Sequence, residues 1–280
     1  MIMSNPGKTR YRTVWISDVH LGSRACRPEP LLAFLSSFEC DQLFLVGDII
    51  DLWSLRRRWY WPQEHNDVVR KILKRASRGT RVTYIPGNHD ERFRDYVGLA
   101  FGGVQIEREA VHTLLDGRRA LVTHGDDFDA VIKNMKIITA LGDVAYDVIL
   151  AMNRALNGFR KKFGWPYWSL AGYIKRKVKY LCQFVSDYEK LLTQHARENA
   201  CTVVVNGHIH RPEMRPIGDI LYCNDGDWVE SCTALVEHLD GTLELLHVEK
   251  DGIGVQPAPD DEPIAAPSRL PADALNRVAP

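Results

Sequence analysis

Short apolar runs that end in a polar or turn-forming residue recur along the chain and predict β-strands. They cover residues 13–17, 42–46, 81–85, 120–123, 202–205 and 220–223. Each run is bounded by Gly, Pro, Asn or Asp, which end strands. Between the early runs, residues 31–38 and 68–76 have the spacing of amphipathic helices. The first half of the chain therefore predicts β-α-β units around a buried, largely parallel sheet.

The second half differs, because residues 129–199 have an almost entirely helical pattern. Apolar residues at spacings of three and four form one stripe, which consists of Ile174, Val178, Leu181, Val185, Tyr188 and Leu192. We interpret residues 129–199 as a helical lid inserted into a catalytic domain of residues 1–250. Two later runs, 233–238 and 243–248, flank Asp240-Gly241 and predict a hairpin. Residues 251–280 are rich in Pro, Ala and Asp and predict a disordered tail.

Composition adds few constraints. The 280 residues are 45% hydrophobic and 26% charged, which is typical of a globular protein, and 36 Lys and Arg balance 36 Asp and Glu. Global charge therefore gives no sign of a polyanionic partner. No apolar run approaches the roughly 18 residues of a spanning helix, and the polar start is unlike a secretory signal. The six cysteines include no CxxC pair, which favours reduced thiols. We expect a cytoplasmic protein.

Residues able to bind metal ions follow five of the predicted strands at their carboxyl ends. They are Asp18 and His20, then Asp48 and Asp51, then Asn88, His89 and Asp90, then His124 and Asp126, and finally His208 and His210. In an open α/β sheet, groups just beyond these strand ends converge on one crevice. Asp and Asn also cap helices and fill turns, but turn chemistry does not require four histidines. Asp51, Asp90 and Asp126 are each as suited to orient the ligands or cap a helix as to be metal ligands themselves.

The donor types indicate the chemistry. Carboxylate, imidazole and amide oxygen without thiolate favour Mn, Fe or Zn over a cysteine-rich structural zinc. There are too many donors for one ion. Two ions about 3.5 to 4 Å apart, bridged by a carboxylate, are suited to in-line attack on phosphorus. The sequence therefore predicts phosphoester hydrolysis.

Five ordered motifs carry a family resemblance. They are Asp18-Val19-His20, Gly47-Asp48-Ile49-Ile50-Asp51, Gly87-Asn88-His89-Asp90, Thr123-His124-Gly125 and Gly207-His208-Ile209-His210. Together they resemble the signature of the calcineurin-like metallophosphoesterases. The resemblance implies an α/β fold, a four-layer αββα sandwich, and two divalent ions, Mn²⁺ first with Fe, Zn or Co as alternatives. It implies that one ion is held by Asp18, His20 and His210, and the other by Asn88, His124 and His208. Asp48 would bridge the ions, and His89 would stabilise charge or protonate the leaving oxygen.

Within that superfamily the chain resembles the UDP-2,3-diacylglucosamine pyrophosphatase branch of lipid A synthesis. The resemblance rests on the SDVHLG start at Ser17, the helical insert and the overall length. It implies hydrolysis of a lipid-linked nucleotide sugar to UMP and an acylated sugar phosphate. The best-known members of the branch have GNRD at the third motif, whereas this chain has the generic GNHD. A broad phosphodiesterase or phosphoprotein phosphatase therefore stays an alternative, as does a scaffold that has lost catalysis.

The insert has an unusual charge distribution. Residues 148–186 contain no Asp or Glu, but they hold eight cations among aromatic residues, namely Arg154, Arg160, Lys161, Lys162, Lys175, Arg176, Lys177 and Lys179. This mixture suits a phosphorylated amphiphile or the anionic inner face of a membrane. We expect Lys175, Lys177, Lys179, Arg57 and Arg58 to contact substrate together with Asn88 and His89. A solvated helix face is the alternative. Nucleic acid is not an expected partner, because the cations are confined to one segment; the oligomeric state is left open.

Overall fold

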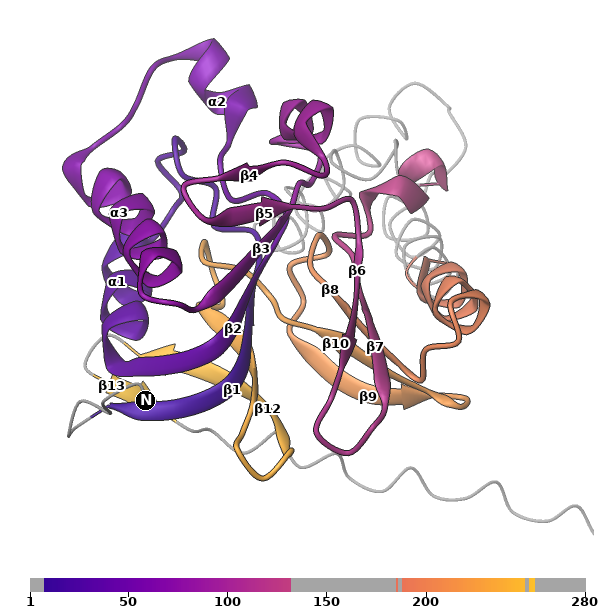
Figure 1. Cartoon of the computed structure of the whole chain (residues 1–280). Coiled ribbons are helices and arrows are strands. Elements are labelled where there is room, and N and C mark those ends of the chain that lie inside the picture. Colours follow the sequence, from indigo (N-terminus) through magenta and orange to yellow (C-terminus); the bar gives the residue numbers. More distant parts are fainter. Residues whose placement is uncertain (1–7, 132–184, 186–187, 250–251, 255–280) are drawn as a thin grey trace, which may run out of the picture.

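The fold is built from two β-sheets that face each other. The computed structural model describes residues 8–131, 185, 188–249 and 252–254 (Figure 1). The first sheet has the strand order β13-β12-β11-β1-β2-β3-β5-β4. Its strands are β1 (Thr9–Ile16), β2 (Phe38–Val46), β3 (Arg81–Ile85), β4 (Ala100–Phe101), β5 (Val104–Ile106), β11 (Thr233–Glu237), β12 (Leu243–Glu249) and β13 (Gly252–Gly254). β1, β2, β3 and β5 run parallel, whereas the other neighbouring strands pair antiparallel.

The second sheet has the order β6-β7-β8-β10-β9. Its strands are β6 (Ala110–Thr113), β7 (Arg119–Val122), β8 (Val203–Asn206), β9 (Glu213–Ile217) and β10 (Ile220–Asn224). β7, β8 and β10 run parallel at its centre, and the two edge strands are antiparallel. The carboxyl ends of the central strands of this sheet carry His124 and His208, as the sequence predicts.

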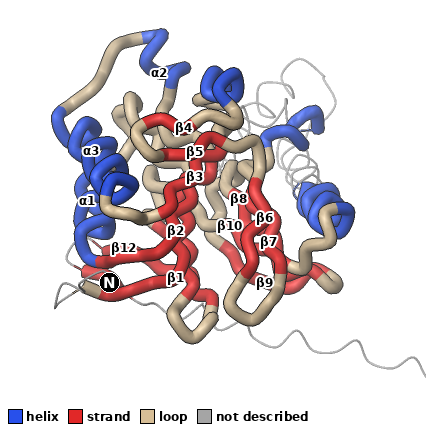
Figure 2. The backbone as a smooth tube through the Cα atoms, viewed as in Figure 1, coloured by secondary structure: helices blue, strands red, loops and turns tan. Residues whose placement is uncertain are grey.

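Helices cover the outer side of each sheet (Figure 2). On the first sheet lie α1 (Pro28–Ser37) and α3 (Gln63–Ser77), and residues 188–198 form a helix against the second. Short helices at α2 (Leu52–Arg57), η1 (Glu91–Tyr96) and η2 (Asp126–Val131) follow strands or loops near the predicted site. This arrangement is the expected four-layer αββα sandwich.

Three apolar cores separate the four layers, because side chains alternate between the two faces of a strand. On β1, Val14 and Ile16 pack toward α1 and α3, while Trp15 packs toward the second sheet. On β8, Val204 packs with Leu192 of the outer helix. All five side chains are fully buried. The short apolar runs of the sequence are therefore strands buried on both faces.

Most predicted elements are present. The hairpin around Asp240-Gly241 is confirmed by the antiparallel pairing of β11 with β12. Tyr188 and Leu192 of the predicted helical stripe are buried against the second sheet, and Ile174, Val178 and Leu181 lie outside the described residues. The expected tail begins at 251, whereas residues 252–254 add the short strand β13 to β12. Backbone pairing of this kind needs no apolar side chains, so composition gives no signal for it. Among the helices of the described residues, none is both long and apolar enough to cross a bilayer.

Candidate metal centre

The predicted ligands lie on loops whose backbone is strained. Asp18, His20, Asp48, His208 and His210 have positive φ angles of 49°, 55°, 53°, 70° and 56°. Residues other than glycine rarely adopt this left-handed conformation, and it persists only where the surrounding structure imposes it. Such strain is concentrated at functional sites. Here it turns the side chains that follow β1, β2 and β8 toward one another.

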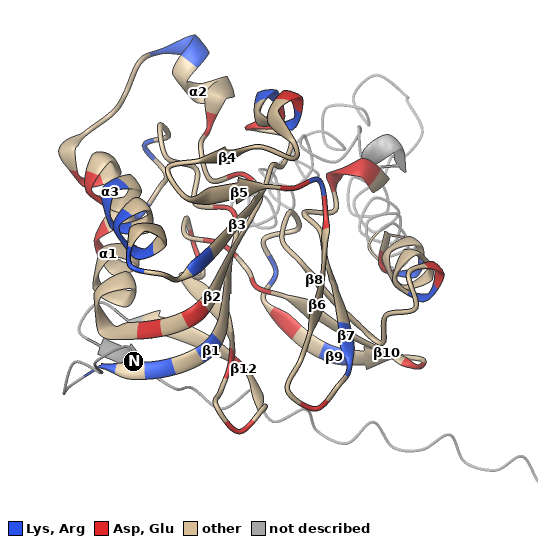
Figure 3. Ribbon diagram, viewed as in Figure 1, with Lys and Arg blue, Asp and Glu red and all other residues tan. Residues whose placement is uncertain are grey.

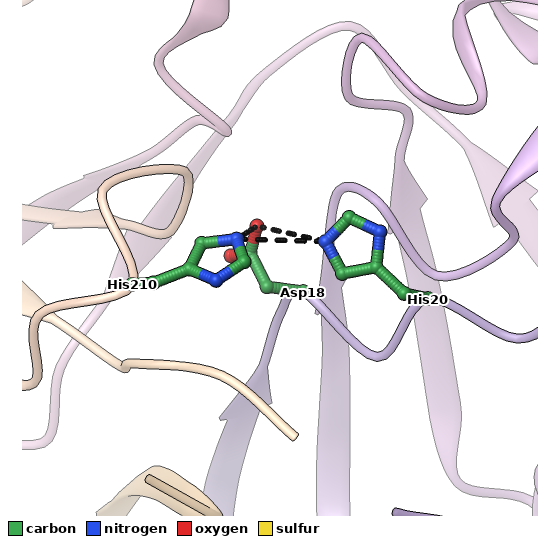
Figure 4. A group of neighbouring side chains, drawn as sticks. All are labelled: Asp18, His20 and His210. Atoms are coloured by element: carbon green, nitrogen blue, oxygen red, sulfur yellow. Dashed lines mark hydrogen bonds and ion pairs between the residues drawn. The ribbon is translucent and has the colours of Figure 1, made fainter. Parts of the chain in front are cut away.

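The first group of side chains consists of Asp18, His20 and His210, and it joins the two sheets (Figure 4). Nε2 of His210 lies 3.0 Å from Oδ1 of Asp18, and Nε2 of His20 lies 3.9 Å from the same oxygen. The two imidazole Nε2 atoms are 3.5 Å apart. The other oxygen of Asp18 accepts a hydrogen bond from the backbone N–H of His208 at 2.9 Å, which fixes the carboxylate.

The second group consists of Asp48, His124 and His208. Nδ1 of His124 lies 2.8 Å from the carbonyl oxygen of Val46, so this nitrogen carries the hydrogen and donates it. Nε2 of His124 is therefore the atom available for a ligand, and it lies 3.5 Å from Oδ1 of Asp48. A backbone carbonyl that fixes the tautomer is the usual support of a metal-binding histidine.

Asp48 lies between the two groups. One carboxylate oxygen, Oδ1, faces His124, and the other, Oδ2, lies 3.9 Å from Nε2 of His20. Oδ1 also accepts a hydrogen bond from the backbone N–H of His89 at 2.7 Å. One buried carboxylate thus presents its two oxygens to two separate sets of imidazoles.

His89 is held at the edge of the same cluster. Its Nδ1 lies 3.0 Å from Oδ1 of Asp51 and its Nε2 lies 3.9 Å from Oδ2 of Asp48. Because a carboxylate only accepts hydrogen bonds, Nδ1 carries a hydrogen and donates it to Asp51. The Asp51 carboxylate also accepts from the backbone N–H of Ser54 and caps α2, and it lies 3.5 Å from Nδ1 of His20. Asp51 thus orients two histidines and caps a helix, which is the alternative to a ligand role that the sequence allows.

Two further observations indicate that the cluster is suited to bind divalent ions. Oδ1 of Asn88 and Nε2 of His124 are buried atoms with no hydrogen bond within the described residues. Buried polar atoms normally have a partner, so these atoms are suited to bind an ion. The cluster is also closely packed, since a Cβ added at Gly87 would overlap Asp48 and the His124 ring. Only glycine lets this loop approach the two side chains.

Electrostatics in the cluster favour cations. Burial acts to raise the pKa of the Asp18 carboxyl, but neighbouring His210 outweighs it and holds that pKa below its usual range. Burial also acts to raise the pKa of the Asp48 carboxyl, and neighbouring His124 outweighs it, so this pKa is lowered as well. Burial acts to lower the pKa of His210, yet Asp18 raises it to about 9, and Asp48 likewise raises the pKa of His124. Protons therefore occupy these imidazoles when ions do not, and metal binding must displace them.

Two of the remaining predicted aspartates support the loops. The Asp90 carboxylate accepts backbone N–H groups from Gly87 at 2.6 Å and Ile49 at 2.8 Å, and the Tyr84 hydroxyl also donates to it. Burial and the nearby Asp48 raise the pKa of Asp90 to about 6. Asp126 accepts two hydrogen bonds from Nη2 of Arg94, at 2.6 and 2.7 Å. Both carboxylates position loops and do not face the imidazoles of the cluster in these contacts.

The remaining residues predicted to contact substrate lie at the end of α2 and in the insert. Arg57 and Arg58 are exposed at the end of α2, six residues beyond its cap at Asp51, which corresponds to about 9 Å of helix. Lys175, Lys177 and Lys179 lie outside the described residues. They stay predictions.

Sequence reasoning missed two neighbours of the cluster. The Trp53 ring lies against the His89 ring, with 4.2 Å between their centroids. Asp225 is fully buried and accepts a hydrogen bond from the Ser17 hydroxyl at 2.7 Å, directly beneath the loop that carries Asp18. The only sequence signal for either was its position beside a motif or after a strand.

The chain is similar in sequence to one protein family and to two named hydrolases. Residues 11–212 match the family model described as calcineurin-like phosphoesterase. The UDP-2,3-diacylglucosamine hydrolase of Blochmanniella pennsylvanica is 22% identical over 216 residues, which cover 73% of this chain and 81% of that protein. The protein of the same name from Azotobacter vinelandii is 30% identical over 122 residues, 41% of this chain and 47% of its own length. Among solved structures, Yfce, a phosphoesterase from E. coli, aligns with a TM-score of 0.44 and 16% identity, over 88% of this chain and 98% of that chain.

Proposed function

Because this chain belongs to the calcineurin-like phosphoesterase family, and is thus a hydrolase of phosphoester or phosphoanhydride bonds, we propose that it cleaves the pyrophosphate of UDP-2,3-diacylglucosamine. The products would be UMP and the acylated sugar 1-phosphate. The names of the two curated relatives support this choice of substrate. The imidazole and carboxylate groups gathered in the cluster support hydrolysis at phosphorus.

The position of Asp48 carries the proposal. Its two oxygens face His124 at 3.5 Å and His20 at 3.9 Å, as a carboxylate that bridges two ions must. Asp18, His20 and His210 would hold one ion, and Asn88, His124 and His208 the other. Two divalent ions, Mn²⁺ in our proposal, would supply charge stabilisation and an activated water when bound.

The chain's own residues would position the substrate and handle a proton. Asp51 fixes the Nδ1 hydrogen of His89, so the Nε2 of that ring faces the cluster. We assign Nε2 to the leaving phosphate oxygen: in the imidazolium form, with a hydrogen on each ring nitrogen, Nε2 donates a hydrogen bond or its proton to that oxygen as the P–O bond breaks, and the neutral ring keeps the hydrogen on Nδ1. The Trp53 ring beside His89 restricts its rotation and keeps water from that side.

An apolar pocket near the cluster supports an acylated substrate. It has a volume of about 500 Å³ and lies between α3 and the η1–β5 segment. Ile49 and Ile50, which follow Asp48 directly, form part of its wall, and Phe93 of η1 forms another part. Its lining is almost entirely apolar, and its size is that of a typical ligand pocket. We propose that it accepts one acyl chain of the substrate.

Filling the pocket tests this assignment. Leu73→Trp places a large ring on the α3 wall of the pocket. We expect kcat/KM for UDP-2,3-diacylglucosamine to fall about tenfold, because lost apolar contacts of a few methylenes have effects of that size. The kcat/KM for a water-soluble phosphodiester should stay unchanged in the same variant. An equal loss for both substrates would show that the substitution acts on the metal cluster instead.

We also propose that the insert binds the anionic inner face of a membrane, where the substrate resides. Each cation near such a surface contributes about 1 kcal/mol, so several cations give reversible association. Replacing Lys175, Lys177 and Lys179 by alanine should release the protein from anionic vesicles at low salt. Sedimentation with vesicles measures this, and retention of the variant would refute the proposal.

One assay separates the proposed activity from its alternative. The GNHD motif at Gly87–Asp90 is the observation that favours a broad phosphodiesterase or phosphoprotein phosphatase. We expect the Mn²⁺-loaded protein to have a higher kcat/KM for UDP-2,3-diacylglucosamine than for a soluble diester or a phosphopeptide. A preference for a soluble compound would assign the cluster to the alternative. No turnover of any of the three would favour the non-catalytic scaffold.

A further inference from the structure

A second polar pocket lies away from the metal cluster and is strongly basic. It has a volume of about 680 Å³ and is lined by two acids, Glu39 and Asp41, and by seven cations. Arg75 is surrounded by Lys8, Arg10, Lys71, Lys74, Arg78 and Arg81. The whole chain has a net charge of zero, so this excess of positive charge is local.

The pocket lies at the opposite end of the first sheet from the metal cluster. β1, β2 and β3 are parallel, and the candidate metal ligands follow their carboxyl ends. The pocket residues precede or begin the same strands: Lys8 precedes β1, Cys40 lies near the start of β2, and Arg81 begins β3. Figure 3 shows basic positions on α3, on β1 and at the start of β3, on the same side of the molecule. The pocket is therefore separate from the site described above.

Arg75 lies in the lining of the pocket, where its side chain is held in place by neighbouring groups. Its side chain is buried, and its Nη2 donates hydrogen bonds to the carbonyl oxygens of Leu35 at 2.6 Å and Phe38 at 2.7 Å. Its guanidinium carbon lies 4.1 Å from the centroid of the Phe38 ring. The Nε donor is buried and has no hydrogen bond within the described residues. A buried charge normally has an anionic partner, and Arg75 has only neutral ones in these contacts.

The surrounding charges repel one another. Nζ of Lys71 contacts the Ser36 hydroxyl, and the pKa of Lys71 is lowered, first by burial and then by Lys8, Arg75 and Lys74. Asp41 already forms an ion pair with Arg10 at 2.7 Å. The pocket thus concentrates positive charge that its own acids do not balance.

We propose that this pocket binds a ligand carrying two or more phosphate groups. A phosphate monoester has a charge of about −1.5 to −2, so two or three groups match the excess of five positive charges. Guanidinium groups suit phosphate because they donate paired hydrogen bonds. A soluble oligophosphate and a diphosphate lipid headgroup offer the same chemistry. Binding of either ligand in this pocket does not depend on the reaction at the metal cluster.

A paired set of variants tests the proposal. Lys74→Ala combined with Arg78→Ala removes two exposed cations from the pocket and leaves the structural contacts of Arg75 intact. The control, Arg70→Ala combined with Lys190→Ala, removes the same charge from α3 and the helix over residues 188–198, outside the pocket lining. Calorimetry with methylenediphosphonate, a pyrophosphate analogue that resists hydrolysis, measures binding to the metal-loaded protein. Methylenediphosphonate should also bind at the metal cluster, and this second binding event should be the same in both variants.

We expect the pocket component to weaken about tenfold or more in the Lys74/Arg78 variant and less than about twofold in the control. Vesicles of equal net charge, with cardiolipin or with phosphatidylglycerol in its place, test the lipid source while the attraction to the cationic insert stays constant: loss of cardiolipin-dependent sedimentation in the pocket variant alone assigns a headgroup. If the pocket variant binds methylenediphosphonate more weakly than the control but sediments with cardiolipin vesicles equally well, the ligand is a soluble one. If neither probe distinguishes the two variants, the pocket is no phosphate site. Unchanged kcat/KM on a soluble diester in both variants shows that the metal cluster is intact and makes the two proposals separately testable.

Discussion

Asp48→Asn is expected to lower kcat/KM by about 10³-fold or more, because metal ions contribute several kcal/mol to stabilising the transition state. Asparagine keeps the size of the side chain but loses one carboxylate oxygen and the charge. Those are the two features that let Asp48 face His124 at 3.5 Å and His20 at 3.9 Å at once. Elemental analysis after loading and desalting should therefore find fewer than two ions per chain.

An exposed aspartate gives the matched control for this substitution. Asp116→Asn removes the same charge from a surface turn, where the Asp116 carboxylate pairs with Arg118 at 2.6 Å. It should keep wild-type activity and two bound ions. The account of Asp48 as a bridge is wrong if Asp48→Asn retains two ions with wild-type kcat/KM.

His89→Asn is expected to lower kcat by about 10²- to 10⁴-fold with metal content unchanged. The reason is that Nε2 of His89 faces the cluster while Asp51 holds Nδ1 at 3.0 Å. If this nitrogen assists the leaving oxygen, the loss should shrink for a substrate with a better leaving group, such as a nitrophenyl phosphodiester. Comparison of kcat for the two substrates in wild type and variant measures the difference.

Measuring the metal content of His89→Asn distinguishes His89 as a proton donor from His89 as a metal ligand. His20, Asp51 and His89 also lie close enough together to hold an ion. Loss of one ion in His89→Asn would make His89 a ligand rather than a proton donor. Asp51→Asn serves as a companion, since it should weaken the orientation of His89 and reduce kcat less than His89→Asn does.

The sequence predicted the cluster well because its residues follow strands. A strand that ends in Asp or His at the carboxyl edge of a parallel sheet places that residue at a shared crevice whatever the details of packing. Asp18, Asp48 and His208 therefore approach one another as expected, although they are far apart in the chain. The buried runs also predicted the central strands, since strands covered on two faces must be apolar throughout, but their division between two sheets was implied only by the family resemblance.

Other features depend on tertiary contacts that no local pattern records. Both positions of the short edge strand β4 are exposed, and the edge strand β9 has no fully buried position and carries Glu213 and Arg215 on its less exposed face, so neither has the apolar pattern of a core strand. Trp53 contacts His89 because α2 begins directly after Asp51, and Asp225 contacts Ser17 because the loop after β10 lies against the loop after β1. The basic pocket draws its cations from residues 8 to 81, so no stretch of sequence shows the excess of charge. By contrast, the cation-rich insert is visible in the sequence because its eight cations all fall within residues 148–186, a stretch without Asp or Glu.

The central claim is that one carboxylate holds two ions between two groups of imidazoles. Crystals of the Mn²⁺-loaded protein, measured at wavelengths on either side of the manganese absorption edge, test it directly. We predict two anomalous peaks about 3.5 to 4 Å apart, one beside His20 and His210 and the other beside His124 and His208, with Asp48 in contact with both. A single peak, or two peaks of which Asp48 contacts only one, would contradict the account.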